Sequence, residues 1–308
     1  MTSLTDRLSL PAFRLGWRVV RLLPAGAAYR LFDAIAHLTH RRDGTQAQRL
    51  RENYRQVRPE LTPSELDALT LAGLRSYLRY WCEVFRLPDL GPQDLLTMVR
   101  TVGDDVPRAT LAQGRGVVLF LGHLGNWDTC GAWATHHFAP VTTVAERLRP
   151  EALYAQFLAY RERLGMRILP LTGGDAVFRE LVRTVRSGGC VPLLADRDLT
   201  AGGVVVDFCG QRARMAAGPA ALALASGCPL HPVSVHYEPH PQRRPGPAAY
   251  RVVIGFGPAL TAAPGARREQ VQDLTQQCAD HLAAAVREHT EDWHMMQRVF
   301  LRAGEVVS

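Results

Sequence analysis

The residues best suited to chemistry lie in the segment Leu121-Gly-His-Leu-Gly-Asn-Trp-Asp128, directly after a short apolar run. A neutral histidine can remove a proton from a hydroxyl group, and a carboxylate on its other ring nitrogen fixes the tautomer and stabilises the imidazolium. His123 and Asp128 are five positions apart, which on a regular helix separates them by about 140°. Gly122 and Gly125 let the chain turn instead, so the segment predicts a hydrogen-bonded His123–Asp128 pair acting as a general base. A purely structural histidine remains the alternative.

The sequence lacks the residues that several other classes of reaction require. The sequence contains no G-x-S-x-G segment for a hydrolase nucleophile, and Cys130 is explained more simply as a small buried thiol. The remaining histidines lack the helical pairing or the cysteine partners of a zinc site, so no metal is expected. All 36 basic residues are arginine, a bias that GC-rich codon usage explains. Without lysine the chain forms neither a P-loop nor a Schiff base.

The formal net charge of +7 indicates an anionic partner, which is a membrane surface, a phosphorylated substrate or a nucleic acid. No run of arginines forms a nucleic-acid tail, and no aromatic-basic stacking platform is present, so nucleic acid is not expected. The six cysteines include no C-x-x-C pair and indicate reduced thiols. The sequence has neither a signal-peptide pattern nor a stretch long enough to span a bilayer, so we expect a protein that is neither secreted nor membrane-spanning.

The elements that must hold the His123 segment follow from the hydrophobic pattern. Short apolar runs rich in strand-forming residues predict strands at 116–121, 141–144, 167–171, 190–194, 204–208, 230–236 and 250–256. Helical patterns lie between several of them, at 151–164, 176–186 and 219–226, and a last helix is expected at 271–289. This alternation predicts an α/β fold with a central, mostly parallel or mixed sheet flanked by helices.

Roughly the first hundred residues predict helices only, at 10–38 with a break at Pro24, at 46–57 and at 64–85. No linker or internal repeat interrupts the chain, so we expect one domain over 1–308, with a helical part at 1–100 and an α/β catalytic core at 101–308. The first helix is amphipathic, and its arginines recur on one side. It is either packed on the domain or laid in a membrane interface with these arginines toward anionic lipid, namely Arg7, Arg14, Arg18 and Arg21.

Several segments together resemble one enzyme family. The His123 segment is similar to the H-x4-D motif of the lysophospholipid acyltransferase superfamily, in the branch of bacterial lipid A lauroyl and myristoyl acyltransferases. The likeness is greatest to the phosphatidylinositol mannoside acyltransferases of actinobacteria. It extends along nearly the whole chain and is carried by the segments 75–88, 145–148, 195–200, 206–210, 213–215, 218–219 and 291–294.

The resemblance implies a reaction and a set of site residues. His123 would be the base that activates an acceptor hydroxyl for attack on the thioester of acyl-CoA, with Asp128 in support. Asp196 occupies the position of an acidic residue that the family places near the histidine, although the family's residue is the longer glutamate. Substrate-binding positions carry over by the same resemblance to Glu146, Arg161 and His294.

The substrate phosphates need fixed positive partners. Arg212 and Arg214 precede the helix that starts near Gly218-Pro219, and they either form an anion-binding site, called here the anion seat, or are solvated on a surface loop. Arg197 and Arg214 are expected near the substrate phosphates. Gly173-Gly174-Asp175 is a second possible seat or a plain turn.

These residues predict an acyl-CoA-dependent acyltransferase that moves a long chain, such as palmitoyl, to a mannose hydroxyl of phosphatidylinositol mannoside. It would need no cofactor besides the co-substrate and would sit peripherally on the cytoplasmic face of the inner membrane. The alternatives are a lysophospholipid or lipid A-type acceptor, and a non-catalytic peripheral membrane-binding protein.

Overall fold

Five strands form the central sheet of the computed structural model, which describes residues 16–145, 151–171, 174–198, 202–242 and 249–302. Their order is β1 (Val99–Val102), β9 (Tyr250–Phe256), β8 (Leu230–Pro239), β2 (Val117–Leu121) and β5 (Cys190–Leu194). Only β8 and β9 run antiparallel, and the other three neighbouring pairs are parallel. The predicted α/β class with a mixed, mostly parallel sheet is confirmed.

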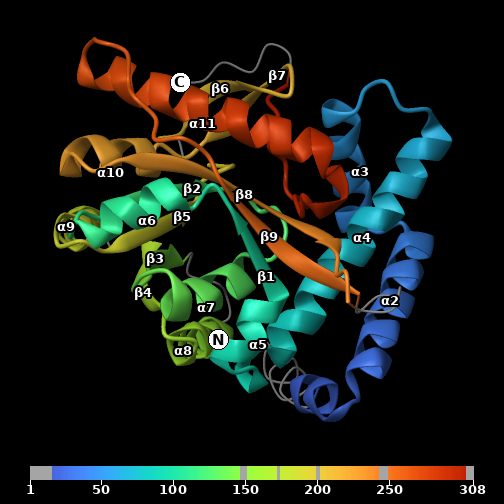
Figure 1. Cartoon of the computed structure of the whole chain (residues 1–308). Helices are drawn as coiled ribbons and strands as arrows, with labels where there is room; N and C mark the ends of the chain where they lie inside the picture. The colour runs from blue at the N-terminus through green and yellow to red at the C-terminus, as the bar shows by residue number, and fades with distance from the viewer. Residues whose placement is uncertain (1–15, 146–150, 172–173, 199–201, 243–248, 303–308) are drawn as a thin grey trace.

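Helices cover both faces of this sheet (Figure 1). One face carries α9 (Gly174–Arg186), α10 (Gly218–Ser226) and α11 (Arg267–Glu288), and the other carries α5 (Pro92–Met98), α7 (Trp127–His137) and α8 (Glu151–Arg163). In β2, Val118 and Phe120 join the first core, whereas Leu119 and Leu121 join the second. Because both faces are buried, the strand is apolar throughout rather than alternating.

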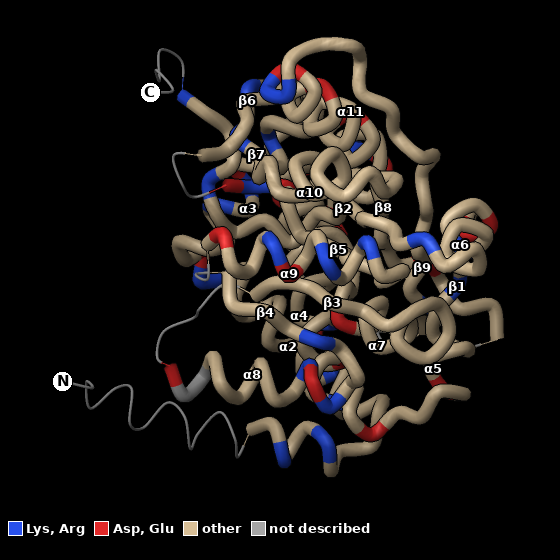
Figure 2. Tube along the Cα trace, turned by 90° about the vertical axis from the view of Figure 1, so that its left-hand side faces the viewer, with Lys and Arg blue, Asp and Glu red and all other residues tan. Residues whose placement is uncertain are grey.

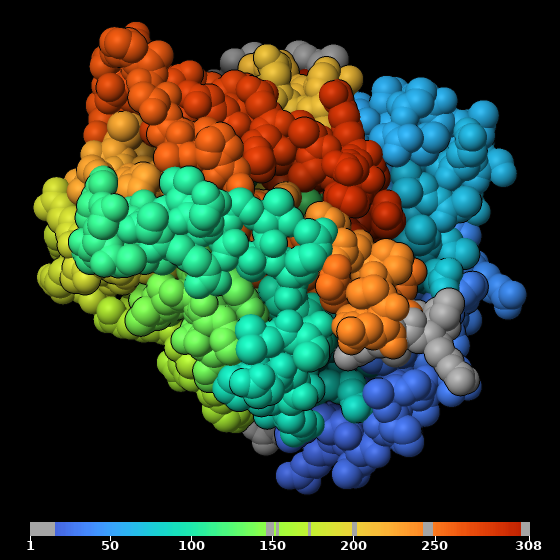
Figure 3. Space-filling model, viewed as in Figure 1, coloured from blue at the N-terminus to red at the C-terminus, as the bar shows by residue number. Residues whose placement is uncertain are grey.

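The N-terminal helices lie against one side of the α/β part and form the blue edge of the space-filling view (Figure 3). Residues 16–22 are helical, Pro24 separates them from α2 (Ala25–Arg42), and α3 (Thr45–Val57) and α4 (Pro63–Arg86) follow. Thr62 and Glu65 cap α4 reciprocally, since the Glu65 N–H donates to the Thr62 hydroxyl and the Thr62 N–H donates to the Glu65 carboxylate. Within the described residues, no helix is both long enough and apolar enough to cross a membrane.

The strand prediction was incomplete in two places. β1 lies at the end of the stretch expected to be helical, and β7 (Gln211–Met215) pairs antiparallel with β6 (Val204–Phe208). β7 carries arginine at the alternate positions 212 and 214, and β1 has only four residues with Arg100 and Thr101 in the middle, so neither strand contains an apolar run. The pair β6–β7 and the parallel pair β3 (Thr142–Ala145) and β4 (Arg167–Pro170) form separate two-stranded sheets. The helices α5 and α6 (Asp105–Ala112), together with the short turns η1 (Leu87–Asp89) and η3 (Thr290–Asp292), were also not predicted.

The contact between α3 and α4 gives a test of this packing. A methyl group at Gly73 of α4 would lie 2.3 Å from the hydroxyl oxygen of Tyr54, which is fully buried. We expect Gly73→Ala to lower the free energy of unfolding by about 1–3 kcal/mol, because Tyr54 must move. In the matched variant Gly26→Ala the new methyl group meets only a flexible arginine at 3.4 Å, so helix propensity should leave stability unchanged or raised by about 0.5–1 kcal/mol. Urea denaturation of both variants checks this, and equal stabilities would contradict the packing.

Candidate active site

His123 and Asp196 come together at one edge of the central sheet. His123 follows β2, Asp196 follows β5, and these two strands are parallel neighbours. The carboxyl ends of parallel strands meet at the same edge of a sheet, where α/β proteins commonly bind ligands. Nδ1 of His123 lies 2.6 Å from Oδ1 of Asp196, so the shorter aspartate does reach the histidine.

The Asp196 carboxylate is fully buried and fully bonded. Its Oδ2 accepts hydrogen bonds from the His123 backbone N–H at 2.8 Å and from the Trp293 indole N–H at 3.1 Å. Burial by itself would raise the pKa of Asp196, but the charge of His123 and these hydrogen bonds outweigh burial and lower it. An ionised Asp196 accepts the Nδ1 proton, so the lone pair of His123 lies on Nε2. The described residues provide no hydrogen-bond partner for Nε2, and 21% of the side chain is exposed.

Asp128 does not bond to His123, and the predicted His123–Asp128 pair is wrong. Oδ1 of Asp128 accepts from Nε of Arg161 at 2.7 Å, and Oδ2 accepts from the Tyr80 hydroxyl at 2.7 Å. Asp128 lies in the first turn of α7, whereas His123 lies in the loop before it, and the Trp127 ring packs edge-on against the His123 ring. The charge of Asp128 raises the pKa of Arg161, and burial raises that of Tyr80, so both groups stay protonated as donors.

Two glycines shape the loop between β2 and α7. Gly125 has a φ of +62°, and a side chain there would collide with the backbone of Val235. A side chain at Gly122 would lie 3.2 Å from Oδ2 of Asp196. The glycines therefore allow the turn that the sequence predicts, but the turn brings His123 to Asp196 instead of Asp128.

A groove of about 570 Å³ opens beside His123. Its walls are mostly apolar and come from β5, α9 and the start of α10, including Val177, Phe178, Leu181, Leu193 and Pro219. Arg197 lines the groove, and its guanidinium donates to the side-chain oxygen of Gln297. An alkyl chain and a phosphate can thus contact neighbouring parts of one groove.

The predicted anion seat is only partly assembled. Arg197 lines the groove together with Gly218 and Pro219 of α10, whereas Arg212 and Arg214 are not among the described residues that line it. Both lie on the face of β7 opposite Ala213 and Met215, which are buried in the core. Of the second seat, Gly174 lines the groove, while Gly173 is outside the described residues.

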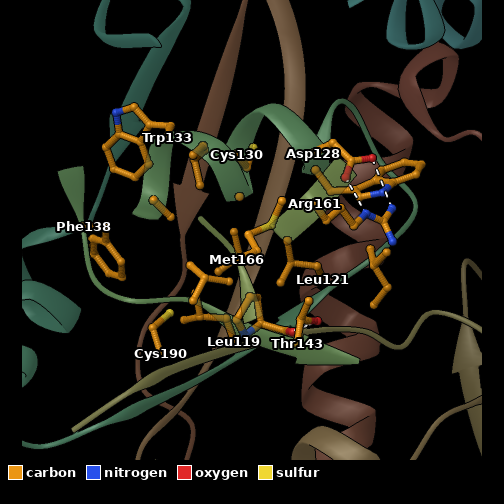
Figure 4. Close-up of a pocket in the computed structure, with 18 of the residues that line it drawn as sticks. Leu119, Leu121, Asp128, Cys130, Trp133, Phe138, Thr143, Arg161, Met166 and Cys190 are labelled. Carbon is orange, nitrogen blue, oxygen red and sulfur yellow. Dashed lines mark hydrogen bonds and ion pairs between the residues drawn. The ribbon is translucent and has the colours of Figure 1, made fainter. Parts of the chain in front are cut away.

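A second, smaller cavity of about 80 Å³ lies under α7 (Figure 4). Leu119, Leu121, Cys130 and Met166 are among its apolar lining residues, and the Asp128–Arg161 ion pair lies at one end. Burial raises the pKa of the Cys130 thiol, which therefore stays protonated, in agreement with its interpretation as a buried structural group. Leu194 of β5 lines both this cavity and the groove beside His123.

His294 lies behind the site, buried against the aromatic ring of Trp127. Its backbone N–H donates to the carbonyl oxygen of His123 at 2.8 Å, and its Nε2 lies 3.0 Å from the Ser76 hydroxyl. Among the described residues that line the groove, His294 is absent. Glu146, also predicted to bind substrate, is outside the described residues.

Sequence reasoning missed the polar residues of α4 that hold these groups. Ser76, Tyr80 and Glu83 are buried and share one face of α4, because they are spaced four and three residues apart. They bond to Asp292, Asp128 and Asn126 respectively, and Glu83 also accepts from the hydroxyl of Tyr237 at 2.6 Å. The sequence signal that could have indicated them is the helical spacing of three polar residues within an otherwise apolar stripe of α4.

Comparison with known proteins shows the family of this chain. The model of the bacterial lipid A biosynthesis acyltransferase family matches residues 10–302. The chain belongs to this family. A phosphatidylinositol mannoside acyltransferase of Mycolicibacterium smegmatis is 40% identical over 92% of this chain and 89% of its own length. The enzyme of that name from Mycobacterium tuberculosis is 41% identical over 94% of this chain and 88% of its own length. The protein is therefore an acyltransferase.

In this acyltransferase, the Asp128–Arg161 ion pair gives a test of how the helix α8 is held. Removing one partner of a buried ion pair leaves an uncompensated charge and costs about 3–5 kcal/mol. We expect Arg161→Met to lower the free energy of unfolding by about 3 kcal/mol in urea titrations, while the double variant with Asp128→Asn recovers part of the loss. Arg163→Met on the exposed side of the same helix is the matched control, and it should stay within about 0.5 kcal/mol of the parent. Equal losses in the two single variants would argue against the ion pair.

Proposed function

We propose that this acyltransferase moves a long acyl chain, palmitoyl in the first instance, from acyl-CoA to a mannose hydroxyl of a phosphatidylinositol mannoside. The observation that carries the proposal is the His123–Asp196 pair, whose histidine lines a largely apolar groove. The acceptor class follows from the names of the mycobacterial relatives, which match 92–94% of the chain.

The pair suits a direct transfer without an acyl-enzyme. Nε2 of His123 takes the proton of the acceptor hydroxyl as its oxygen attacks the thioester carbonyl carbon. The tetrahedral intermediate collapses with cleavage of the carbon–sulfur bond, and the imidazolium returns the proton to the thiolate. An ester and free CoA leave, and Asp196 stabilises the imidazolium in between. Base, orientation and charge stabilisation suffice for this reaction, so we propose acyl-CoA as co-substrate and no cofactor.

The groove supports the binding of both parts of acyl-CoA. Its apolar walls suit an alkyl chain, and Arg197 beside the start of α10 offers a guanidinium and free backbone amides to a phosphate. Arg161 retains 22% exposure of its side chain. We propose Arg161, Glu146 and His294 as substrate-binding residues from the family resemblance, and Arg214 from its place before the start of α10.

The assay that tests the proposal uses palmitoyl-CoA and a mannosylated phosphoinositide with purified protein. We expect His123→Ala to lower kcat by about 10²–10⁴-fold, because the general base is lost. His136→Ala, which removes an exposed histidine from the end of α7, is the matched control and should keep full activity. Release of free CoA and mass spectrometry of the lipid product are the measurements. Full activity of His123→Ala would overturn the mechanism, and absence of CoA release from the parent would overturn acyl-CoA as the proposed donor.

A lipid A-type acceptor is the second candidate, because the matching family model is described by lipid A biosynthesis. A panel with lipid A precursors, lysophospholipids and mannosylated phosphoinositides separates the acceptors. Under our proposal, the mannosylated lipid gives the highest kcat/KM.

We also propose that the N-terminal helices hold the enzyme peripherally on the cytoplasmic face of the inner membrane, where acyl-CoA and the lipid acceptor meet. Tyr29 and Phe32 of α2 are buried in a cluster with residues of α4. Leu31, Ile35 and Leu38 follow each other at helical spacing and are 43%, 38% and 48% exposed, and Leu22 is 84% exposed. Figure 2 marks basic residues on the 16–22 segment and on the neighbouring α8. Arg18 and Arg163 line a separate groove between the 16–22 segment and α8. Of the other arginines predicted to face lipid, Arg21 pairs with Asp89, and Arg7 and Arg14 are outside the described residues.

Vesicle sedimentation tests the proposed membrane contact. Replacing Leu31, Ile35 and Leu38 by serine should weaken binding to vesicles containing anionic lipid at least about tenfold, because each apolar side chain that enters the interface contributes on the order of 1 kcal/mol. The control replaces Leu96, Val102 and Val106, which are similarly exposed at 47–51% but lie on α5, β1 and α6, and it should bind as the parent does. An equal loss in both triple variants would contradict the proposal.

A further inference from the structure

The segment that follows α11 contacts the proposed active site at three successive residues. The carbonyl oxygen of Asp292 accepts from the Gly125 N–H at 2.8 Å, and the His294 N–H donates to the carbonyl oxygen of His123, also at 2.8 Å. Between them, the Trp293 indole donates to Asp196. The backbone of the loop before α7 is thus bonded on both sides of Leu124, which forms an antiparallel bridge with Trp293.

The Asp292 side chain connects this segment to two other elements. Its Oδ1 accepts from the Ser76 hydroxyl of α4 at 2.6 Å, and its Oδ2 accepts from the Tyr237 N–H of β8 at 2.7 Å. The side chain is buried, with 2% of the residue exposed. Burial raises the pKa of Asp292 to about 6, which leaves the carboxylate mostly ionised at neutral pH.

The hydrogen atoms of this chain of groups can be assigned by counting donors. A serine hydroxyl has one proton, and an ionised Asp292 requires it. Ser76 therefore accepts from Nε2 of His294 at 3.0 Å, which puts the imidazole proton on Nε2 and the lone pair on Nδ1. Burial lowers the pKa of His294 to about 3, so the ring is neutral. Its Nδ1 has no partner among the described residues.

We infer that Asp292 and Ser76 are positioning residues, which hold His294 as its Nε2–H tautomer and thereby hold Trp127 and the His123 loop in place. The His294 ring lies 6.1 Å from the Trp127 ring, which lies 5.4 Å from the His123 ring, centroid to centroid. Neither Asp292 nor Ser76 lines the groove beside His123 in the described chain. The effect on catalysis rests on the proposed role of His123 as base.

Asp292→Asn is the variant that tests this inference. Its amide oxygen can still accept from the Tyr237 N–H, but its NH₂ group donates to Ser76. Ser76 must then donate to Nε2 of His294, and the imidazole proton moves to Nδ1. We expect the ¹⁵N chemical shifts of His294 to show Nε2–H in the parent and Nδ1–H in Asp292→Asn. We also expect kcat to fall by about 10²-fold with little change in KM, because a small displacement of a reacting group costs that much.

Two further variants keep the test decisive. Glu291→Gln makes the same carboxylate-to-amide change one residue away and should leave both the tautomer and kcat unchanged. Ser76→Ala removes the hydroxyl group that connects Asp292 to His294 and leaves a buried methyl group in its place. It should lower kcat as well, which provides a second measurement if Asp292→Asn does not fold.

The possible results separate this inference from the proposed function. An Nδ1–H tautomer in the parent, or a normal kcat in Asp292→Asn and Ser76→Ala, would overturn the inference and leave the proposed function intact. A parent enzyme without acyl transfer would overturn the proposed function. The ¹⁵N spectra of His294 would then decide by themselves whether Asp292 and Ser76 set its tautomer.

Discussion

The buried carboxylate of Asp196 is the constraint on which the site depends. A charge removed from water is tolerated only when hydrogen bonds and an opposite charge compensate it. Asp196 meets this requirement with the ring and backbone N–H of His123 and the indole of Trp293. These groups come from the ends of two parallel strands and from the segment after the last helix, so the site exists only when all three are in place. The same bonds hold His123 with its lone pair on Nε2.

The helix α4 supplies the second requirement, a support behind the loop that carries His123. Its buried face carries Ser76, which bonds to Asp292 after α11, and Tyr80 and Glu83, which bond to Asp128 and Asn126 at the start of α7. Burial of Glu83 raises its pKa, while hydrogen bonds from Tyr237, Asn126 and Tyr29 act in the opposite direction. Buried polar groups are costly unless every partner is present, so this face specifies one arrangement of α4 against the sheet.

Asp128 has a structural role in this arrangement. Because it bonds to Arg161 and Tyr80, it ties α7 to α8 and α4 at the end of the cavity under α7. The acidic residue of the H-x4-D segment thereby supports the helix that follows His123, while the acidic partner of the histidine comes from β5, 73 residues away in the chain. The two residues of the H-x4-D segment thus have different partners: His123 bonds to Asp196, and Asp128 bonds to Arg161 and Tyr80.

The sequence by itself determined the fold class, most helices and strands, the position of His123 at the end of a buried strand, and the family. These follow from local patterns, such as the apolar run before His123 and the alternation of strand and helix patterns after it. Only the tertiary structure decided which carboxylate faces His123, because strand order in the sheet, not distance along the chain, brings β2 beside β5. It also decided that Ser76, Glu83 and Asp292 support the site, since the partner of a buried polar group is set by packing between elements that the sequence leaves far apart.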